Sequence, residues 1–208
     1  MKNIVVLVSG GGTNLQALID AQGRGEIKNG EIVCVVSSNP NAFALERAKN
    51  NDIDTEVIRR KDYVEFDEYD RALTELLQSK NTDVVVLAGF MTILGSKVIK
   101  VFENRIINIH PSLIPSFCGE GYYGLKVHEE ALKKGVKVTG ATAHFVNEVC
   151  DGGPIIIQKA VEVQNGDTPE ILQKRVMEQA EWKILPKAVS LFCEDKIIVK
   201  DNKTEILD

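Results

Sequence analysis

Short apolar runs alternate with helix-like segments along the first 110 residues of the chain. The runs have the composition of strands that are covered on both faces, and they lie at residues 4–8, 32–36, 84–87 and 106–109, with a shorter one at 54–58. Apolar residues at helical spacing fall between them, at residues 15–21, 42–49, 66–78 and 96–102. This alternation predicts an α/β fold with an open, Rossmann-like, mostly parallel twisted sheet and helices on both faces.

The C-terminal half has a different pattern, which predicts an antiparallel β extension of this sheet. Two β-rich runs, at residues 136–145 and 155–163, are joined by a segment with a turn signal, VNEVCDGGP. A glycine-rich loop at residues 116–126 and a helix around residues 128–134 precede them. Thr168 and Pro169 are typical of a helix start, and we expect a long helix to about Cys193, interrupted or bent near Pro186. Residues 196–199 indicate a short edge strand.

The length, charge and cysteines of the chain limit its organisation and its partners. A chain of 208 residues suits one domain, within which we expect two halves, residues 1–110 and 111–208. The net charge of −5 argues against a protein that binds nucleic acid or a membrane surface. No apolar run approaches the roughly 20 residues that span a bilayer. The four cysteines form no CxxC pair and the chain starts without a secretory signal, so we expect a cytoplasmic protein with reduced thiols and no metal site.

The segment VLVSGGGTNLQALI, residues 6–19, leads from a buried strand through three consecutive glycines into a helix. Glycines allow the backbone to approach a ligand closely, and the amide groups at a helix start attract an anion. The segment matches neither GxGxxG nor GxxxxGK[ST], so neither a dinucleotide nor a nucleoside triphosphate is indicated specifically. A tight turn capped by Thr13 is the alternative. Three glycines exceed what a turn needs, which favours a phosphate site.

Asn108 and His110 lie two residues apart at the end of a predicted strand, so their side chains share one face of the sheet. Open α/β sheets bind ligands at the carboxyl ends of their parallel strands. An amide beside an imidazole provides two donors for a developing oxyanion. A structural histidine at a strand end fits the same pattern, and the local sequence does not separate the two interpretations.

Asp151 lies on the DGGP turn between two β-rich runs, from which a carboxylate can reach into a cleft. For this residue in isolation, a turn-forming role is the better interpretation. We expect His144, on the preceding strand, and His128, near a helix start, to be structural residues. Cys118 and Cys150 lie in loops, and no residue near them in sequence would activate their thiols.

Four segments together carry a family resemblance: VLVSGGGTNLQALID, DVVVLAGFMTIL, NIHPSLIPSF and ATAHFVNEVCDGGPII. With these segments in this order and spacing, the chain resembles the phosphoribosylglycinamide formyltransferases essentially from end to end. The resemblance implies an enzyme of purine biosynthesis that transfers the formyl group of 10-formyltetrahydrofolate to the primary amine of glycinamide ribonucleotide. It also implies that the partners are these small molecules, that the protein is a monomer or homodimer, and that no metal is needed.

The resemblance further implies roles for residues in each half of the chain. Residues 1–110 would hold the ribonucleotide phosphate, and residues 111–208 would form the folate-binding and catalytic half. The catalytic residues would be Asn108, His110 and Asp151. The residues that bind the ribonucleotide would be Gly11, Gly12, Thr13, Asn14, Met91 and Glu181. The residues that bind folate would be Phe90, Met91, Thr92, Ile93, Leu94, Asn108 and Val146.

A direct chemical mechanism fits these roles. The substrate amine attacks the formyl carbon and gives a tetrahedral intermediate with a negative oxygen, to which Asn108 and protonated His110 would donate. We expect Asp151 to keep His110 charged, because a nearby carboxylate favours the imidazolium form. Asp151 would also assist proton transfer through a water molecule.

Three features depart from the usual pattern of that family. The loop at residues 116–126 is longer than in many members, and Thr92 stands where arginine is frequent. The stretch MEQAEW is one residue longer than in some relatives, which affects the register of Glu181. These departures bear on the folate and ribose contacts and leave the chemistry unchanged.

Each alternative function would require different sequence features. A formyltetrahydrofolate hydrolase would share Asn108, His110 and Asp151 and pass the formyl group to water, but such proteins usually carry an N-terminal regulatory domain. A methionyl-tRNA formyltransferase would need a further C-terminal domain with a basic face, whereas the net charge here is negative. The missing GxGxxG argues against a nicotinamide-dependent oxidoreductase. The three residues together argue against a non-catalytic nucleotide-binding module.

Overall fold

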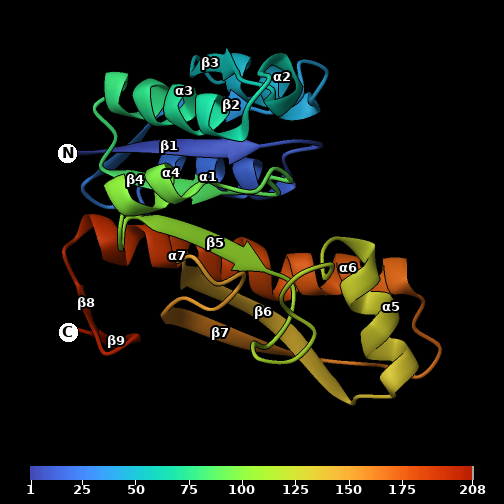
Figure 1. Cartoon of the computed structure of the whole chain (residues 1–208). Coiled ribbons are helices and arrows are strands. Elements are labelled where there is room, and N and C mark those ends of the chain that lie inside the picture. Colours follow the sequence, from blue (N-terminus) through green and yellow to red (C-terminus); the bar gives the residue numbers. More distant parts are fainter. Residues whose placement is uncertain (208) are drawn as a thin grey trace.

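Seven strands form one mixed sheet in the computed structural model, which describes residues 1–207 (Figure 1). The strand order is β3-β2-β1-β4-β5-β6-β7. The parallel part comprises β1 (Lys2–Val8), β2 (Gly30–Ser37), β3 (Asp54–Val57), β4 (Val84–Leu87) and β5 (Ile106–His110). The antiparallel extension comprises β6 (Val138–Phe145) and β7 (Ile155–Glu162). The predicted α/β fold is therefore confirmed, including its antiparallel extension.

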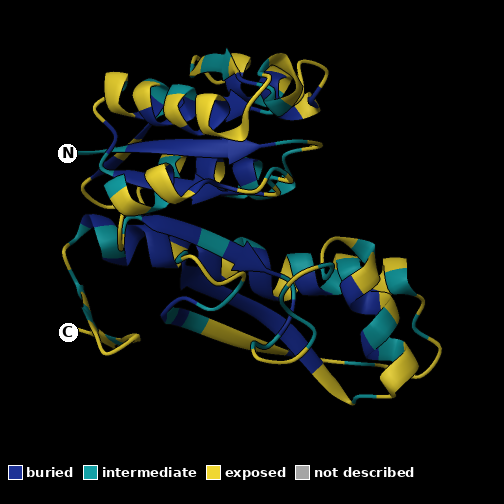
Figure 2. Ribbon diagram, in the orientation of Figure 1, coloured by how far each residue is buried: buried dark blue, intermediate teal, exposed yellow. Residues whose placement is uncertain are grey.

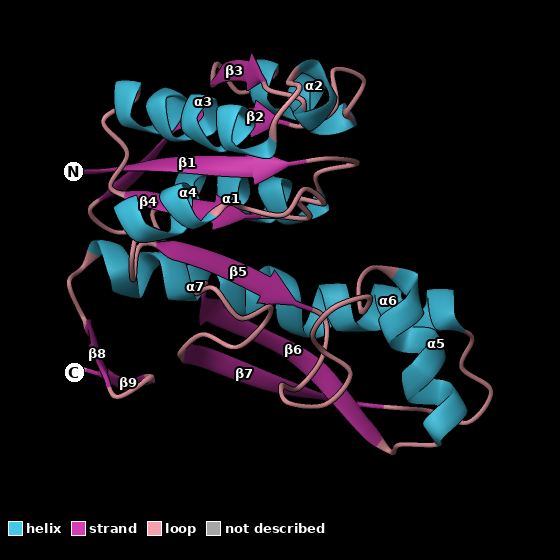
Figure 3. Cartoon of the chain, viewed as in Figure 1, coloured by secondary structure: helices cyan, strands magenta, loops and turns pink. Residues whose placement is uncertain are grey.

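Helices cover both faces of the parallel part of the sheet, as the continuous apolar runs predict (Figure 3). One face packs against α1 (Thr13–Gly23), α2 (Phe43–Lys49) and α7 (Trp182–Cys193). The other face packs against α3 (Phe66–Ser79) and α4 (Ser96–Val101), and a 3-10 turn, η1 (Arg60–Asp62), precedes α3. Alternate residues of β1 enter the two cores: Ile4, Val6 and Val8 face α1, whereas Val5 and Leu7 face α3.

The antiparallel half is arranged differently, because loops cover the face of β5 that lies opposite α7. Ile107 and Ile109 belong to the core under α7, so Asn108 and His110 point to the other face. The loop of residues 111–124 crosses this face before α5 (Leu125–Lys134), and the Ile114 amide donates to the Thr142 hydroxyl of β6 at 3.1 Å. Two polar residues of β5, Asn108 and His110, are therefore left facing loops.

The predicted long C-terminal helix consists of three parts: α6 (Pro169–Val176), the π-helical turn η2 (Met177–Glu181) and α7. Thr168 caps α6 as expected, since its side chain accepts a hydrogen bond from the Ile171 amide. The predicted position of the interruption, near Pro186, was wrong, because Pro186 lies inside α7. A proline cannot donate the helical hydrogen bond to the carbonyl four residues before it. For Pro186 this is the carbonyl of Trp182, the residue that follows the π-helical turn. A π-helical turn holds one residue more than an α-helical turn, which is the geometry that the expected additional residue in the stretch MEQAEW would need.

The C-terminal segment corrects a second prediction. The expected edge strand is β8 (Ile197–Lys200), but it pairs with β9 (Lys203–Ile206) in a separate two-stranded sheet. The β8–β9 hairpin is attached to the segment that leads into β7: the Asn202 amide donates to the Gly152 carbonyl at 3.2 Å, and the Thr204 hydroxyl to the Ile155 carbonyl at 2.6 Å. The polar sequence of β9, KTEI, carries no apolar alternation that would have indicated a strand.

Burial is greatest in the middle of the sheet and least at its two outer strands, β3 and β7 (Figure 2). The strands β1, β4 and β5 are buried along most of their length, whereas half of the residues of β7 are exposed. Among the described residues, no helix is long and apolar enough to cross a membrane.

Candidate active site

The Gly-rich loop follows β1 and ends where α1 begins. Gly12 is the N-cap of α1 with a φ of 71°, and a Cβ at this position would lie 2.7 Å from the Cβ of Ala44. Only glycine fits that conformation and that contact. A Cβ at Gly10 or Gly11 would meet no atom within 4 Å, so this part of the backbone faces open space. The amide groups at the start of α1 are thus open to an anion, which agrees with the predicted phosphate site.

Arg47 of α2 lies against the outer side of the Gly-rich loop. Its Nε donates to the Gly11 carbonyl at 2.8 Å, and Nη1 donates to the side chain of Gln16 at 3.0 Å. This cation next to the predicted phosphate site was not singled out in the sequence, because it lies 36 residues from Gly11. The Ser9 hydroxyl accepts a hydrogen bond from the Met91 amide at 2.8 Å, which joins the Gly-rich loop to the loop after β4.

Asn14 and Glu181 come together from opposite ends of the chain. The Asn14 amide nitrogen donates to Oε2 of Glu181 at 2.7 Å. Burial raises the pKa of Glu181 to about 7, although the hydrogen bond from Asn14 acts in the opposite direction. Oδ1 of Asn14 is buried and has no hydrogen-bond partner among residues 1–207. This oxygen is therefore available to accept a hydrogen bond from a ligand.

Asn108 and His110 share one face of β5, as predicted, and the antiparallel pairing of β5 with β6 adds His144. Asn108 lies opposite His144, and Nδ2 of Asn108 is 3.2 Å from Nε2 of the histidine. Nδ1 of His144 lies 2.7 Å from the Phe145 carbonyl, so Nδ1 carries the hydrogen and Nε2 accepts from Asn108. His144, which we expected to be a structural residue, thus contacts Asn108 of the predicted catalytic set. The missing signal was the register of β6 on β5, which brings together two residues that are 36 positions apart in sequence.

The turn that carries Asp151 has a constrained backbone. Asp151 has a φ of 53°, in the left-handed region that non-glycine residues rarely adopt. A side chain at Gly152 or Gly153 would collide with neighbouring atoms, so both positions need glycine. The side-chain amides of Asn147 and Asn202 both donate to the Gly152 carbonyl, at 3.3 and 3.2 Å. The direction of the Asp151 side chain is therefore set by its neighbours on both sides.

The Asp151 carboxylate lies at the centre of the cluster. Its Oδ2 is 3.4 Å from Nδ1 of His110 and accepts a hydrogen bond from the Gly119 amide at 2.8 Å, and its Oδ1 is 3.6 Å from Nε2 of His144. Burial raises the pKa of Asp151, but the imidazoles of His144 and His110 and the Gly119 amide together outweigh it. The pKa of Asp151 therefore stays below its ordinary value, and the carboxylate is ionised at neutral pH.

His110 is 4% exposed, and both of its ring nitrogens face acceptors. Nε2 lies 2.8 Å from the Phe117 carbonyl and must donate to it, while Nδ1 faces Asp151. Burial lowers the pKa of His110 by more than Asp151 and Phe117 raise it. The expectation that Asp151 keeps His110 charged is thus corrected: in the free protein, His110 is mainly neutral at neutral pH. The two acceptors nevertheless prepare the ring to hold a second proton.

The predicted folate-binding segment forms the loop that follows β4. It contains Phe90, Met91, Thr92, Ile93 and Leu94. Phe90, Leu94 and Val146 gather in the core under α3 and α4, where they meet residues of β4 and β5. Met91 is 56% and Ile93 75% exposed. An apolar cluster therefore lies beside Asn108, with two further apolar side chains at the surface that are free to contact a ligand.

The remaining histidine fits its predicted structural role. His128 on α5 is fully buried, and burial lowers its pKa to about 4, so its ring is neutral at neutral pH. Its ring nitrogens have no hydrogen-bond partner within the part of the chain that the structure describes. In the same part of the chain, the histidine, cysteine and acidic side chains form no group of three or more that is arranged to hold a metal ion.

Comparisons with known proteins place this geometry in a family. The chain matches the family described as formyl transferase over residues 2–189. It is 42% identical to a phosphoribosylglycinamide formyltransferase of Haemophilus influenzae, a match that covers 97% of this chain and 92% of the relative. The crystal structure of glycinamide ribonucleotide transformylase 1 from Symbiobacterium toebii has a TM-score of 0.94 and 42% identity, and the match covers all of this chain and 95% of that one.

A related enzyme class matches less closely. A formyltetrahydrofolate deformylase from Pseudomonas syringae has a TM-score of 0.88 at 30% identity, and the match covers all of this chain but 66% of that one. The higher identity and the nearly complete mutual coverage favour the transferases. The chain therefore belongs to the formyl transferase family and, within it, to the phosphoribosylglycinamide formyltransferases.

Proposed function

We propose that this chain transfers the formyl group of 10-formyltetrahydrofolate to the primary amine of glycinamide ribonucleotide, giving formylglycinamide ribonucleotide and tetrahydrofolate. The observation that supports this most strongly is the meeting of two sites at one edge of the sheet. The Gly-rich loop follows β1, and the cluster of Asn108, His110, His144 and Asp151 follows β5. The bond between Met91 and Ser9 joins the loops that lie between them.

The Gly-rich loop serves as the anchor for the ribonucleotide. The open amides from Gly10 to Thr13 receive the 5′-phosphate at the positive end of α1, and Arg47 adds a cation beside them. Asn14 and Glu181 accept hydrogen bonds from the ribose hydroxyls. An anchor remote from the reacting amine converts binding energy into orientation of that amine.

The loop after β4 receives the folate. Its backbone borders the apolar cluster of Phe90, Leu94 and Val146, which suits a flat heteroaromatic ring. The exposed side chains of Met91 and Ile93 lie where the remainder of the folate would extend over the surface. The formyl group then reaches Asn108, which lies on β5 next to this cluster.

The chemistry is direct attack of the amine on the formyl carbon. The carbonyl π electrons move to the oxygen, which accepts a hydrogen bond from the Asn108 amide and one from His110, each donor contributing about 2.7–4 kcal/mol. His110 makes this bond with Nε2, which in the free protein donates to the Phe117 carbonyl, so the formyl oxygen replaces that carbonyl. The negative charge that develops on the oxygen favours protonation of His110, and Asp151 stabilises the resulting imidazolium through Nδ1.

Proton transfer completes the reaction. The attacking nitrogen becomes positive and must lose a proton, while N10 of the folate must gain one before the carbon–nitrogen bond breaks. Asp151 is ionised and lies next to both imidazoles, so it positions a water that carries the proton between the two nitrogens. The product is the formylated amine, and the leaving group is tetrahydrofolate.

The acceptor of the formyl group tests the proposal. Loss of 10-formyltetrahydrofolate is followed spectroscopically with and without glycinamide ribonucleotide, and the formylated product is identified by mass. We expect turnover only when the ribonucleotide is present. Equal turnover in its absence would instead support formyl transfer to water, the second candidate, which the likeness to the deformylase favours. A protein without turnover in either mixture contradicts both functions.

A further inference from the structure

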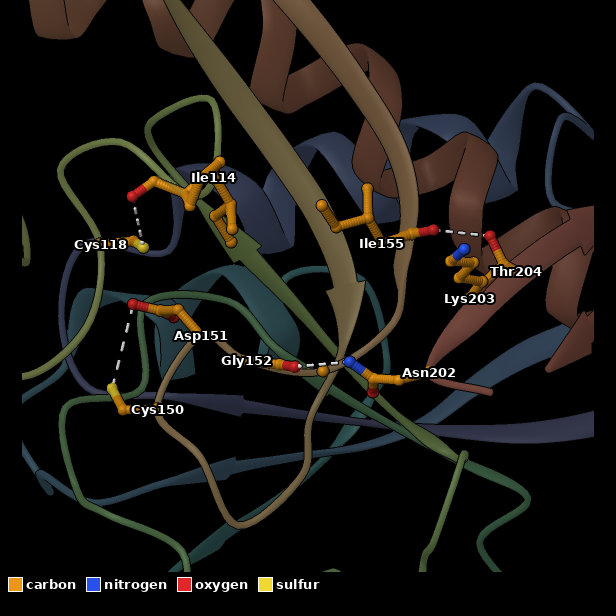
Figure 4. Close-up of a pocket in the computed structure, with 11 residues that line it drawn as sticks. Ile114, Cys118, Cys150, Asp151, Gly152, Ile155, Asn202, Lys203 and Thr204 are labelled. Carbon is orange, nitrogen blue, oxygen red and sulfur yellow. Dashed lines mark hydrogen bonds between the residues drawn. The ribbon is translucent and has the colours of Figure 1, made fainter. Parts of the chain in front are cut away.

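A cavity of about 580 Å³ borders the turn that carries Asp151, and two thiols line it (Figure 4). Cys118 comes from the loop of residues 111–124, and Cys150 directly precedes Asp151. The other walls come from the cis-proline segment that precedes Cys118, the start of β7 and the tip of the β8–β9 hairpin. The proposed reaction uses neither thiol.

The two cysteines flank one hydrogen bond of the catalytic cluster. Cys150 Sγ lies 3.9 Å from Oδ2 of Asp151, and the amide of Gly119, next to Cys118 in sequence, donates to the same oxygen at 2.8 Å. Cys118 Sγ lies 3.3 Å from the Pro115 carbonyl. Figure 4 shows the Asp151 carboxylate between the two sulfur atoms. A single carboxylate therefore separates two thiols that come from different loops.

The other two cysteines of the chain differ in their surroundings. Cys34 and Cys193 are buried in the two cores, and burial raises the pKa of each thiol to about 11. Cys150 is exposed and Cys118 half-buried. A small oxidant in solution therefore reaches the pair beside Asp151 and is kept from the core thiols, which serve as an internal control.

We propose that Cys118 and Cys150 are an oxidisable pair, joined by peroxide in a disulfide that removes Asp151 from its contact with His110. This inference rests on the proposed catalytic role of Asp151. Peroxide oxidises the Cys150 thiolate to a sulfenic acid, and the peroxide is reduced to water. The Cys118 sulfur then attacks the oxidised sulfur, forms the sulfur–sulfur bond and releases a second water. The net change is loss of both thiol hydrogens, and an external dithiol reverses it.

Geometry explains why this bond would inactivate the site. A disulfide needs sulfur atoms about 2.05 Å apart and Cβ atoms about 3.5–4.5 Å apart, whereas the carboxylate of Asp151 now lies between the thiols. Closing the pair therefore expels the carboxylate and breaks its bond with the Gly119 amide. The 3.4 Å contact with His110 is lost with it, and misplacement of a catalytic group by about 1 Å costs on the order of 100-fold in rate.

The rate of oxidation has a defined pH dependence. Burial raises the pKa of both thiols, and the negative charge of Asp151 raises it further, because a thiolate beside a carboxylate is disfavoured. Only the thiolate reacts with peroxide. Oxidation is therefore slow at neutral pH and faster in alkaline buffer. It is also faster in the variant Asp151→Asn, which removes that charge.

The test compares the full-length protein with Cys118→Ser and Cys150→Ser, each treated with hydrogen peroxide. Mass spectrometry of proteolytic fragments detects the cross-link, and formyl transfer is measured before oxidation, after it, and after addition of dithiothreitol. In the unmodified sequence we expect a fragment pair joined through Cys118 and Cys150, about 100-fold lower kcat/KM, and recovery with dithiothreitol. Each serine variant should form no cross-link and keep most of its activity after the same treatment, since the inactivating bond needs both sulfur atoms.

Two outcomes would overturn the proposal: absence of the Cys118–Cys150 cross-link in the oxidised protein, or a cross-linked protein that keeps its activity. If a serine variant does not fold, the alanine variant replaces it, and circular dichroism checks both. The cross-link is detected by mass without reference to activity. Failure of the proposed function, seen as an inactive reduced protein, is therefore distinguished from failure of the thiol pair.

Discussion

Asn14 donates a 2.7 Å hydrogen bond to Glu181 and so connects the Gly-rich loop to the π-helical turn, 167 positions later in the chain. The partner in this bond is a buried acid with a pKa of about 7. A buried group that titrates near neutral pH makes the stability of the fold depend on pH.

The variant Glu181→Gln should be more stable than the unmodified protein in alkaline buffer. The pKa of Glu181 rises from its ordinary value of 4.5 to about 7 on folding, so the folded state holds a proton that the unfolded state has released. Stability from this group is present below pH 4.5 and is lost as the pH rises through 7. Thermal unfolding should therefore give a higher Tm for the variant at about pH 8 and nearly equal values at about pH 4.5.

Glu178→Gln is the matched control, because Glu178 lies on the same turn but is exposed. Its Tm should follow that of the unmodified protein at every pH.

Isothermal titration should also show that Glu181→Gln binds glycinamide ribonucleotide more weakly. A variant with the pH dependence of the unmodified protein would show that Glu181 is ionised throughout.

Gly12→Ala should cost more stability than Gly25→Ala, although both glycines have nearly the same φ, 71° and 70°. A left-handed conformation costs a non-glycine residue roughly 1–2 kcal/mol, and at Gly25 that is the whole cost, since a Cβ there meets no atom within 4 Å. At Gly12 the added Cβ also collides with Ala44. Urea unfolding measures the difference. Only Gly12→Ala should weaken ribonucleotide binding, and equal effects of the two changes would contradict the phosphate-site assignment.

The pKa of His110 should lie below 6.5 and respond in opposite directions to two changes in its neighbours. Asp151→Asn removes a charge that favours the imidazolium and should lower the pKa further. His144→Gln removes a neighbouring imidazole that lowers the pKa of His110 and should therefore raise that pKa. NMR titration of the imidazole signals measures both shifts.

Protonation of His110 also changes the stability of the folded protein. Because the folded pKa of His110 is below its ordinary value, the stability it contributes is present above about pH 6.5 and is lost as the pH falls through the folded pKa. Unfolding experiments in moderately acidic buffer should show this loss, and His110→Gln should remove it. A folded pKa above 6.5 would mean that Asp151 outweighs burial after all.

Asn202→Ala should lower kcat, because Asn202 donates a hydrogen bond to the Gly152 carbonyl, next to Asp151. The affinity for the ribonucleotide should not change, because Asn202 lies far from the Gly-rich loop in sequence. Asn147 still donates to that carbonyl, so we expect a loss of roughly tenfold or less rather than the loss of a catalytic group. Asp201→Ala, at the neighbouring exposed position of the hairpin tip, is the control and should leave kcat unchanged. Steady-state kinetics with each substrate varied separate kcat from KM. Equal kcat for Asn202→Ala and the unmodified protein would show that the hairpin has no positioning role.

The strands and helices of the parallel half are predictable from the sequence because their signals are local. The run from Ile4 to Val8 is buried on both sides, which its continuous apolar composition indicates directly. The Gly-rich loop is equally readable, since three glycines before a helix restrict the conformation. The features that the sequence did not indicate depend on contacts between distant segments. His144 joins the cluster through the register of β6 on β5, and neither strand alone specifies that register.

The protonation of His110 was mispredicted for a related reason. Asp151 is its neighbour, as expected, but the degree of burial at the end of β5 is decided by loops that the sequence does not place. Likewise, the carbonyl of Phe117 is a backbone group, and no side-chain motif identifies it as a partner of His110. The residues that carry the chemistry were therefore recognisable in the sequence, whereas their burial and their backbone partners are seen only in the structure.

The π-helical turn lets the C-terminal helix hold one more residue without rotating the surfaces on either side of it. In an uninterrupted α-helix, one inserted residue would turn everything that follows by about 100°, and buried residues of α7 such as Leu185 and Ala188 would leave the core. Here the widened turn is limited to five residues, and buried residues of both α6 and α7 pack in the same core. The segment that carries Glu181 is therefore a point at which this helix holds an extra residue without displacing the buried face of α7.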